Sequence, residues 1–213
     1  LNTARGSGVS LAQLKRRHDA VLLTIGAWWG KPMGIPGEEH ELVVDGVGWL
    51  REINAGQRPT LPNKVVVVGG GDVAMDACRV ARRLPGCEKV TVLYRRGPAE
   101  IPARRVELEG AIAEDVEFVY HTQPVSVEPR GHGLRLRCVT TQLGEPDADG
   151  RPRPVNVSGS EHDIDCGMVI ASVGQKGVCD ELDGLGMMAQ DRIDADFGTM
   201  RTTDPQVFAA GDG

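Results

Sequence analysis

The sequence lacks the patterns that mark a metal site, a disulfide framework or a membrane span. No CxxC pair and no metal-ligand spacing occurs among its five cysteines, Cys78, Cys87, Cys138, Cys166 and Cys179. We therefore expect free, buried thiols in a reducing cytoplasm. The five histidines, at positions 18, 40, 121, 132 and 162, form no cluster either, and we assign no metal. The longest apolar stretch, AVLLTIGAWWG, is shorter than the roughly 20 residues that cross a bilayer.

Positive charge is also scarce. Thirty acidic side chains outnumber 24 basic ones, and the net charge of −6 argues against nucleic acid as the main partner, because phosphate binding needs a basic surface. The chain has no signal peptide and does not begin with methionine, so Leu1 is expected to be an internal residue of a longer protein. Its 213 residues, 40% of them hydrophobic, suffice for one large domain or two small ones.

What is present is an alternation of strands and helices. The stretch KVVVVGGGDVAMDACRVARRL predicts a buried strand, a glycine turn and a helix over residues 72–84. KVTVLYRR predicts a second strand, AEIPARRVELEGAIAED a second helix with Pro102 near its start, and VEFVY a third strand. This order is typical of a βαβαβ unit with a parallel sheet.

Other patterns precede this unit. Ser10 and Gln13 form a capping box that predicts a short helix, and the apolar run DAVLLTIGA (residues 19–27) predicts a buried strand. A further helix is predicted over residues 46–54, because Gly56 follows it as a stop signal.

The pattern of alternating strands and helices ends after the βαβαβ unit. From Pro124 onward the residues alternate as in an antiparallel hairpin and meander, with RGHG as a turn and GEPDADGRPRP as a loop. An apolar strand then returns to Gly174. Residues 175–203 are expected to be mostly irregular.

The glycine turn carries the clearest chemical signal. Gly69, Gly71 and Ala74 have the spacing G-x-G-x-x-A between a strand and a helix, which is the setting of a dinucleotide-binding loop. The first glycine permits the turn, the second lets a pyrophosphate approach the backbone, and the alanine lets the helix pack closely, with helix N–H groups facing the phosphates. The predicted cofactor-binding residues here are Gly69, Gly70, Gly71, Asp72, Val73 and Ala74. The Asp72 side chain itself is expected only to cap the helix, and the alternative is a glycine-rich corner that binds nothing.

The choice between NAD and NADP is made near the end of the second strand, about 20 residues beyond the motif. This sequence has Arg95 and Arg96 there, where an acidic residue would accept hydrogen bonds from the ribose hydroxyls. Guanidinium groups match a 2′-phosphate, so we expect NADPH. The alternative is that both arginines lie on a solvated loop.

Taken as an ordered set, these stretches resemble the small (β) subunit of NADPH-dependent glutamate synthase and its relatives, flavoproteins with two dinucleotide-binding domains. VVVVGGGDVAMDA and VTVLYRR are similar to the family's NADPH fingerprint, and EIPARRVELEGAIAEDVEF to the segment that leads to its third strand. DAVLLTIGA with GIPGEE, VIASVGQKG and TTDPQVFAAGD resemble its passages between the FAD and NADPH domains.

The resemblance implies an α/β fold: a Rossmann-like parallel sheet with helices and an antiparallel β-meander, with remnants of a flanking FAD domain. Residues 1–60 would be the end of the first FAD-domain segment and a linker, 61–178 the NADPH-binding domain, and 179–213 the return segment and the start of the second FAD-domain segment. One departure is Asp115, which stands where the family has a glycine at a helix end. Aspartate tolerates a left-handed backbone better than most residues.

The same resemblance implies flavin contacts. Gly211, Asp212 and the backbone after them would hold the ribityl and phosphate portion of FAD, with Gly26 and Gly174 close to the flavin. The family's first FAD fingerprint and its cysteine-rich iron–sulfur region are not among these residues. We therefore expect an NADPH-binding fragment, inactive and without FAD by itself, whose partners are the missing FAD domain and an iron–sulfur region or subunit.

Two functions of different classes remain open. The first is a cytoplasmic oxidoreductase in which NADPH passes hydride to FAD and electrons leave through iron–sulfur centres; the cofactors carry this chemistry, so no catalytic acid or base is named. The second is a dinucleotide-binding or redox-sensing module without turnover. A dithiol reductase of the thioredoxin reductase type would need a CxxC, which the sequence does not contain.

Overall fold

The computed structural model describes residues 8–146, 150–177, 187–189 and 192–211. The chain divides into two compact units, here named the sheet unit (Gly30–Gly174) and the terminal unit (Leu1–Trp29 with Gln175–Gly213). It passes from one unit to the other twice. The short strands β2 (Trp29–Gly30) and β12 (Gln175–Lys176) lie at these crossings.

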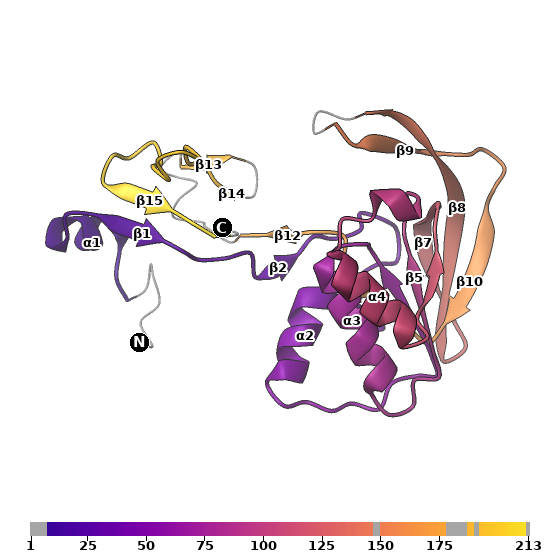
Figure 1. Ribbon diagram of the computed structural model, residues 1–213. Coiled ribbons are helices and arrows are strands. Elements are labelled where there is room, and N and C mark those ends of the chain that lie inside the picture. The colour runs from indigo at the N-terminus through magenta and orange to yellow at the C-terminus, as the bar shows by residue number, and fades with distance from the viewer. Residues whose placement is uncertain (1–7, 147–149, 178–186, 190–191, 212–213) are drawn as a thin grey trace. The chain divides into compact units, whose positions relative to one another are not determined.

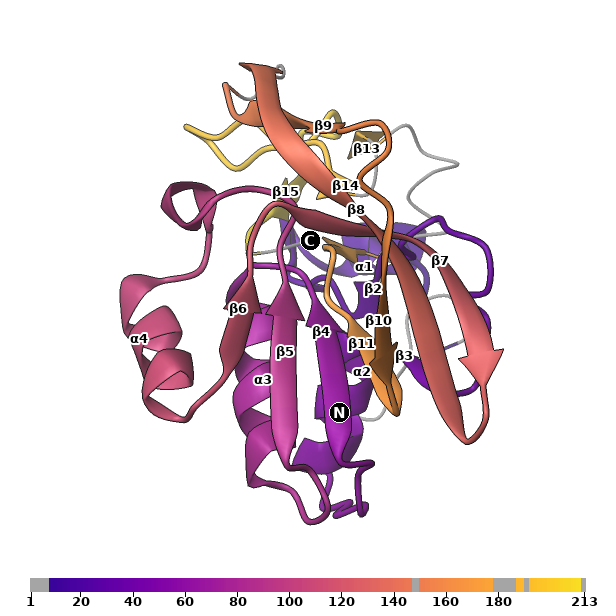
Figure 2. The same ribbon diagram turned by 90° about the vertical axis from the view of Figure 1, so that its right-hand side faces the viewer.

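A five-stranded parallel sheet forms the centre of the sheet unit (Figure 2). In spatial order its strands are β3 (Val43–Asp45), β11 (Met168–Ala171), β4 (Lys64–Val68), β5 (Lys89–Leu93) and β6 (Glu117–Val119). All four pairings between neighbours are parallel. Sequence reasoning missed β3, because three residues ending in an aspartate carry too little periodicity to mark a strand.

Three helices gather on one face of this sheet (Figure 1): α2 (Gly46–Asn54), α3 (Asp72–Arg83) and α4 (Arg105–Ala113). Each joins two parallel strands, and the chain moves in one direction across the sheet, from β3 to β4, β5 and β6. Because such crossovers are right-handed, successive steps in one direction place their helices on the same face. Residues 30–60, which we expected to close the first FAD segment, contribute β3 and α2 to this layer.

An antiparallel sheet covers the opposite face. It consists of β7 (Thr122–Arg130), β8 (Gly133–Pro146), β9 (Pro152–Asn156) and β10 (His162–Cys166), in which β8 pairs with the other three. The predicted α/β fold with an antiparallel meander is therefore confirmed. The loop predicted over GEPDADGRPRP is shorter than expected, because β8 continues to Pro146 and β9 begins at Pro152.

The layers on both faces of the parallel sheet explain why β4 contains four successive valines. Val65 and Val67 belong to the apolar core on the helix side, whereas Val66 and Val68 belong to the core beneath the antiparallel sheet. Successive side chains of a strand point to opposite faces, so a strand buried on both faces reads as a continuous apolar run. All four valines are at least 94% buried.

The connection from β5 to α4 differs from its prediction. A 3₁₀ turn, η1 (Pro98–Glu100), comes first, and α4 begins at Arg105 with Arg104 as its N-cap. Pro102 thus precedes the helix instead of lying near its start. At the other end of α4, Asp115 has a φ of +59°, which confirms the left-handed backbone expected there.

The terminal unit is built from smaller pieces. Its helix α1 (Leu11–Arg17) begins with the predicted capping box. Strand β1 (Val21–Leu23) is shorter than predicted and pairs in parallel with β15 (Val207–Ala209). Two further short strands, β13 (Met188–Ala189) and β14 (Arg192–Ile193), pair antiparallel. Among the described residues of either unit, no helix is long and apolar enough to cross a membrane.

Candidate dinucleotide-binding site

The glycine loop follows β4 and leads directly into α3. Gly69 has a φ of +141°, and a Cβ there would lie 2.2 Å from the carbonyl oxygen of Ser172, at the end of the neighbouring strand β11. A Cβ on Gly70 would lie 2.6 Å from the ring of Tyr94, at the end of β5. Packing within the chain therefore requires both residues to be glycine.

Gly71 is glycine for a different reason. Its φ of −87° and ψ of 178° are extended values that any residue adopts, and no atom of the described residues lies within 4 Å of the position its Cβ would take. The fold therefore does not require a glycine here. The space is open on the side from which a ligand would approach the backbone, as a pyrophosphate does at the second glycine of this motif. Ala74, by contrast, is fully buried in the helix-side core.

The N-terminus of α3 has no side-chain cap. Gly71 is the N-cap residue, and the first helical hydrogen bond runs from the Met75 N–H to its carbonyl. The prediction that Asp72 caps the helix is wrong: its carboxylate accepts hydrogen bonds from the backbone N–H of Arg104, at 2.9 Å, and from Arg104 Nε, at 3.0 Å. Val73, the next residue, is half-buried.

A segment that sequence reasoning missed lies against the loop. We name residues 97–104, between β5 and α4, the strap. The Ala103 N–H donates to the carbonyl of Gly70 at 3.1 Å, and the hydroxyl of Tyr94 donates to the carbonyl of Glu100 at 2.6 Å. The proline and glycine punctuation of this stretch predicts a turn but not which backbone it meets.

The two candidate 2′-phosphate ligands differ in surroundings. Arg95 is exposed, whereas Arg96 is only 7% exposed and its Nε donates to the carbonyl of Pro152 in β9, at 2.7 Å. The side chain of Thr141 also donates to the carbonyl of Arg95, at 2.8 Å. Arg96 therefore ties the antiparallel sheet to the end of β5, and Arg95 is the one whose side chain faces solvent.

Ser172, next to the loop, was not predicted as a site residue. Its hydroxyl is buried against Gly46 at the start of α2 and has no hydrogen-bond partner among the described residues. A buried hydroxyl normally finds one, so this group is open to a ligand or a water molecule. Two residues on, the exposed Gly174 has a φ of +133°, and its carbonyl accepts from the Lys31 N–H.

The remaining predicted flavin contacts belong to the terminal unit. Gly26 has a φ of +68°, and the Nε1 of Trp28 lies 3.1 Å from the position a Cβ would take. Gly211 has a φ of +91°, with no atom within 4 Å of its Cβ position. Asp212 lies outside the described residues.

Four of the five cysteines lie in the described part of the chain, and burial keeps their thiols away from solvent. These four, Cys78, Cys87, Cys138 and Cys166, are free and buried. Burial raises the pKa of the Cys78, Cys138 and Cys166 thiols to about 12, which keeps them protonated and poorly nucleophilic. Cys179 lies outside the described residues, and no cluster of three metal-binding side chains occurs among the residues that are described.

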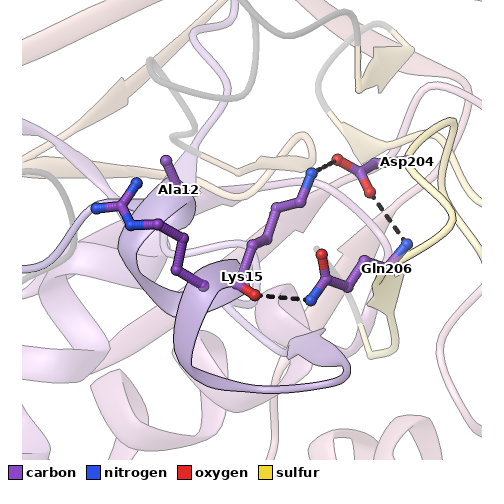
Figure 3. A pocket seen from close by; sticks show the side chains of 5 residues that line it. Ala12, Lys15, Asp204 and Gln206 are labelled. Carbon is purple, nitrogen blue, oxygen red and sulfur yellow. Dashed lines mark hydrogen bonds and ion pairs between the residues drawn. The ribbon is translucent and has the colours of Figure 1, made fainter.

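A hollow in the terminal unit does not have the character of a ligand site (Figure 3). It is lined by Ala12, Lys15, Arg16, Asp204 and Gln206. Lys15 is paired with Asp204, whose carboxylate also accepts from the Gln206 backbone N–H, and the Gln206 side chain donates to the Lys15 carbonyl. These polar groups bind one another and fasten α1 to the turn before β15.

A parallel sheet whose central strand passes through a glycine loop into a helix defines an α/β domain of the dinucleotide-binding kind. The model of the pyridine nucleotide-disulphide oxidoreductase family matches residues 7–213. The chain belongs to this family.

Sequence relatives agree with this assignment. Over the whole chain, the sequence is 40% identical to the NADP(+)-dependent formate dehydrogenase subunit beta of Moorella thermoacetica, of which it covers 31%. It is 34% identical to the glutamate synthase [NADPH] small chain of Escherichia coli strain K12, of which it covers 49%. The chain thus spans less than half the length of either relative, and the resemblance to glutamate synthase small subunits is confirmed.

A solved structure supports the fold. FprA from Mycobacterium tuberculosis in complex with NADPH superposes with a TM-score of 0.78, covering 99% of this chain and 61% of that one. The two sequences are 20% identical, so this likeness concerns the fold alone.

Proposed function

We propose that this chain is the NADPH-binding part of a flavin-dependent oxidoreductase similar to the glutamate synthase small subunit. The observation that carries the proposal is Gly71, a glycine that no contact with the described part of the chain requires, at the N-terminus of α3, where no side chain caps the helix. Helix N-termini with free N–H groups favour phosphates, and a missing Cβ at this position lets them approach. The residues present therefore fit a dinucleotide.

Preference for NADPH is proposed to rest mainly on Arg95. Its exposed side chain follows the strand whose end discriminates the two nucleotides in this type of fold. Arg96 would act indirectly, because its buried side chain holds β9 near the same strand end. Two relatives named for NADP(+) or NADPH support the choice of nucleotide.

The residues near the flavin are proposed to be Gly26, Gly174, Gly211 and Asp212. Gly211 suits this role, because its left-handed backbone and the open space beside it leave room for a ligand to approach. When bound, NADPH supplies a hydride and FAD accepts it for onward transfer through iron–sulfur centres, so the protein's part is to bind and orient. No side chain of this chain is proposed as a catalytic acid or base.

Calorimetric titration of the chain with NADPH and with NADH, together with an absorbance spectrum, tests the proposal. We expect binding of NADPH in preference to NADH, by a protein that is colourless and reduces dyes little. Failure to bind either nucleotide would overturn the proposal. Stoichiometric yellow flavin would show that the domain borders are misplaced, and a full-length protein that binds NADPH but transfers no hydride would favour the non-catalytic module.

A further inference from the structure

Several acidic side chains lie near the start of α3. Asp72 is the first residue of the helix, and its side chain is 43% exposed. Asp76 follows one turn later, and its pKa is raised by burial and by the nearby carboxylates of Glu107 and Asp72. Asp72, Asp76 and Glu107 are therefore close enough to interact near the first turns of α3, and their negative charge disfavours an anion at that end of the helix.

Arg104 offsets this charge from the strap. Two hydrogen bonds from this one residue, one from its backbone N–H and one from Nε, occupy both oxygens of the Asp72 carboxylate. The same guanidinium donates from Nη2 to Glu107 at 3.3 Å. Its side chain nevertheless remains 67% exposed. A planar guanidinium carries five donors, so it can bind these carboxylates and still donate to a phosphate.

The strap has little freedom to move relative to the loop. Next to Arg104, the Ala103 N–H is bonded to the Gly70 carbonyl, and Ala103 is 9% exposed. Tyr94 lies against Gly70 with its ring and holds Glu100 with its hydroxyl. The backbone at Arg104 is thus held beside the glycine loop by Ala103 and by its own N–H on Asp72, and the Asp72 carboxylate also accepts from the guanidinium.

We propose that Arg104 binds the 5′-diphosphate of the nucleotide and that Asp72 is a positioning residue that holds the Arg104 guanidinium beside the loop. This inference rests on the proposed function, because it assumes that a dinucleotide occupies the glycine loop. It assigns the strap a role that is separate from that of Arg95, which would act on the 2′-phosphate. Arg104 therefore contributes to the affinity for NADP⁺ and NAD⁺ alike.

The test compares Arg104→Ala with wild type in titrations with NADP⁺, NAD⁺ and adenosine 2′-monophosphate. The variant should bind NADP⁺ and NAD⁺ about tenfold or more weakly, because a charge-assisted contact is lost and the acidic groups are left uncompensated. Adenosine 2′-monophosphate has no 5′-phosphate, so its affinity should not change. Arg105→Ala is the matched control: that arginine pairs with Glu109, its side chain is 90% exposed, and its loss should change nothing.

Substitutions of Asp72 test its role by the direction in which the NADP⁺ affinity changes. If its charge only repelled the ligand, Asp72→Ala would tighten NADP⁺ binding; a positioning role predicts weaker binding instead. Asp72→Asn keeps an oxygen that can accept the Arg104 N–H, and should restore part of the affinity.

Three results would count against this inference. Unchanged NADP⁺ affinity in Arg104→Ala would overturn it while leaving the proposed function standing. Equal weakening of adenosine 2′-monophosphate would show that Arg104 acts on the 2′-phosphate or through the fold. A wild-type chain that binds none of the three nucleotides would overturn the proposed function and this inference together.

Discussion

The two units bury their apolar side chains to very different degrees. In the sheet unit both faces of the parallel sheet are covered, by helices on one side and by the antiparallel sheet on the other. In the terminal unit one cluster of seven described residues is buried, around a parallel pair of strands. Exposed large apolar side chains occur in both units, for example Phe197 at 90% in the terminal unit and Val106 at 65% in the sheet unit, so the difference lies in the size of the buried clusters.

From this difference we expect the sheet unit to be the more stable of the two and to carry nucleotide binding. Two-stranded sheets are marginal in water without further packing, and regions with few buried contacts open at low free-energy cost. The glycine loop, the strap and Arg95 all belong to the sheet unit. Nucleotide binding should therefore survive damage to the terminal unit.

A buried charge in each unit tests this separation most severely. Val67, in β4, and Val207, in β15, are both 0% exposed. An unpaired carboxylate at either site is strongly destabilising, so Val67→Asp should lower the free energy of unfolding by more than about 4 kcal/mol and abolish NADP⁺ binding. Val207→Asp should disrupt only its own unit and leave NADP⁺ affinity within about twofold of wild type. The measurements are thermal unfolding and calorimetric titration.

The opposite result would break the comparison. If Val207→Asp abolished binding as completely as Val67→Asp, the two units would have to be treated as one folding unit. Val207→Ala, which leaves a smaller defect, would then show whether binding declines in step with stability.

The second prediction distinguishes a glycine that leaves room for the ligand, Gly71, from a glycine that packing within the chain requires, Gly69. Gly71→Val should lower NADP⁺ affinity by roughly a hundredfold or more, about 2.7 kcal/mol, because the side chain fills the space of the pyrophosphate. The midpoint of thermal unfolding should barely change, since the backbone is extended and nothing lies near the new Cβ. Gly69→Val should instead destabilise the fold, because its Cβ would meet the Ser172 carbonyl at 2.2 Å.

A matched control lies in the other unit. Among the described residues, only Asp196 Oδ1 lies near the Cβ position of Gly198, at 3.6 Å, so Gly198→Val should alter neither affinity nor stability. Unchanged NADP⁺ affinity in Gly71→Val would remove the main support for the assigned site.

The third prediction divides the arginine pair. Arg95→Ala should weaken NADP⁺ by about tenfold and leave NAD⁺ unchanged, since only one of these ligands has a 2′-phosphate and a charge-assisted bond contributes about 1.5–3 kcal/mol. Arg96→Ala should lower the unfolding midpoint and weaken both nucleotides, because β9 loses its anchor at the Pro152 carbonyl. Equal loss of both nucleotides in Arg95→Ala would show that this arginine acts on something other than the 2′-phosphate.

The sequence predicts best what neighbouring residues decide. The strand, glycine turn and helix around Gly69 follow from the pattern of consecutive residues, so the sequence predicts them well. Helices α2 and α3 end within one residue of their predicted bounds. We also expected the apolar strand at Val207–Ala210 to pair with the strand that ends near Ala27. β15 does pair with β1, in parallel, and the register joins Val207 to Val21. Residues 175–203 were expected to be irregular, and their described parts contain only short strands.

The side-chain contacts that could not be predicted from the sequence join residues that lie far apart along the chain. Arg96 meets Pro152, 56 positions away, and Asp72 meets Arg104, 32 positions away. No local pattern distinguishes an arginine that binds a ligand from one that binds a carbonyl. For the same reason Asp72 was expected to cap its own helix, although a tertiary contact takes its carboxylate elsewhere. Terminal residues are ordered only where something holds them, so we expect a frayed or loosely packed end at Gly211–Gly213. This stays a prediction, because the last two of these residues are not described.

The smallest predicted effect concerns an ion-pair network found between α3 and α4. Glu114 accepts from Arg83 and Arg79, and these hydrogen bonds hold the pKa of its carboxyl below the ordinary value of 4.5. A carboxyl with a lowered pKa stabilises the fold above its unfolded pKa, and this contribution is lost as the pH falls through the folded pKa. Glu114→Gln should thus lower stability at pH 7 by about 1 kcal/mol or less, because exposed Arg83 is screened by water. The difference from wild type should vanish well below pH 4.5.

Glu109→Gln, which disrupts only an exposed pair with Arg105, is the control and should change little at any pH. Thermal unfolding of the three proteins across this range provides the measurement, and a Glu114→Gln deficit that persisted in acid would show that packing rather than charge is responsible.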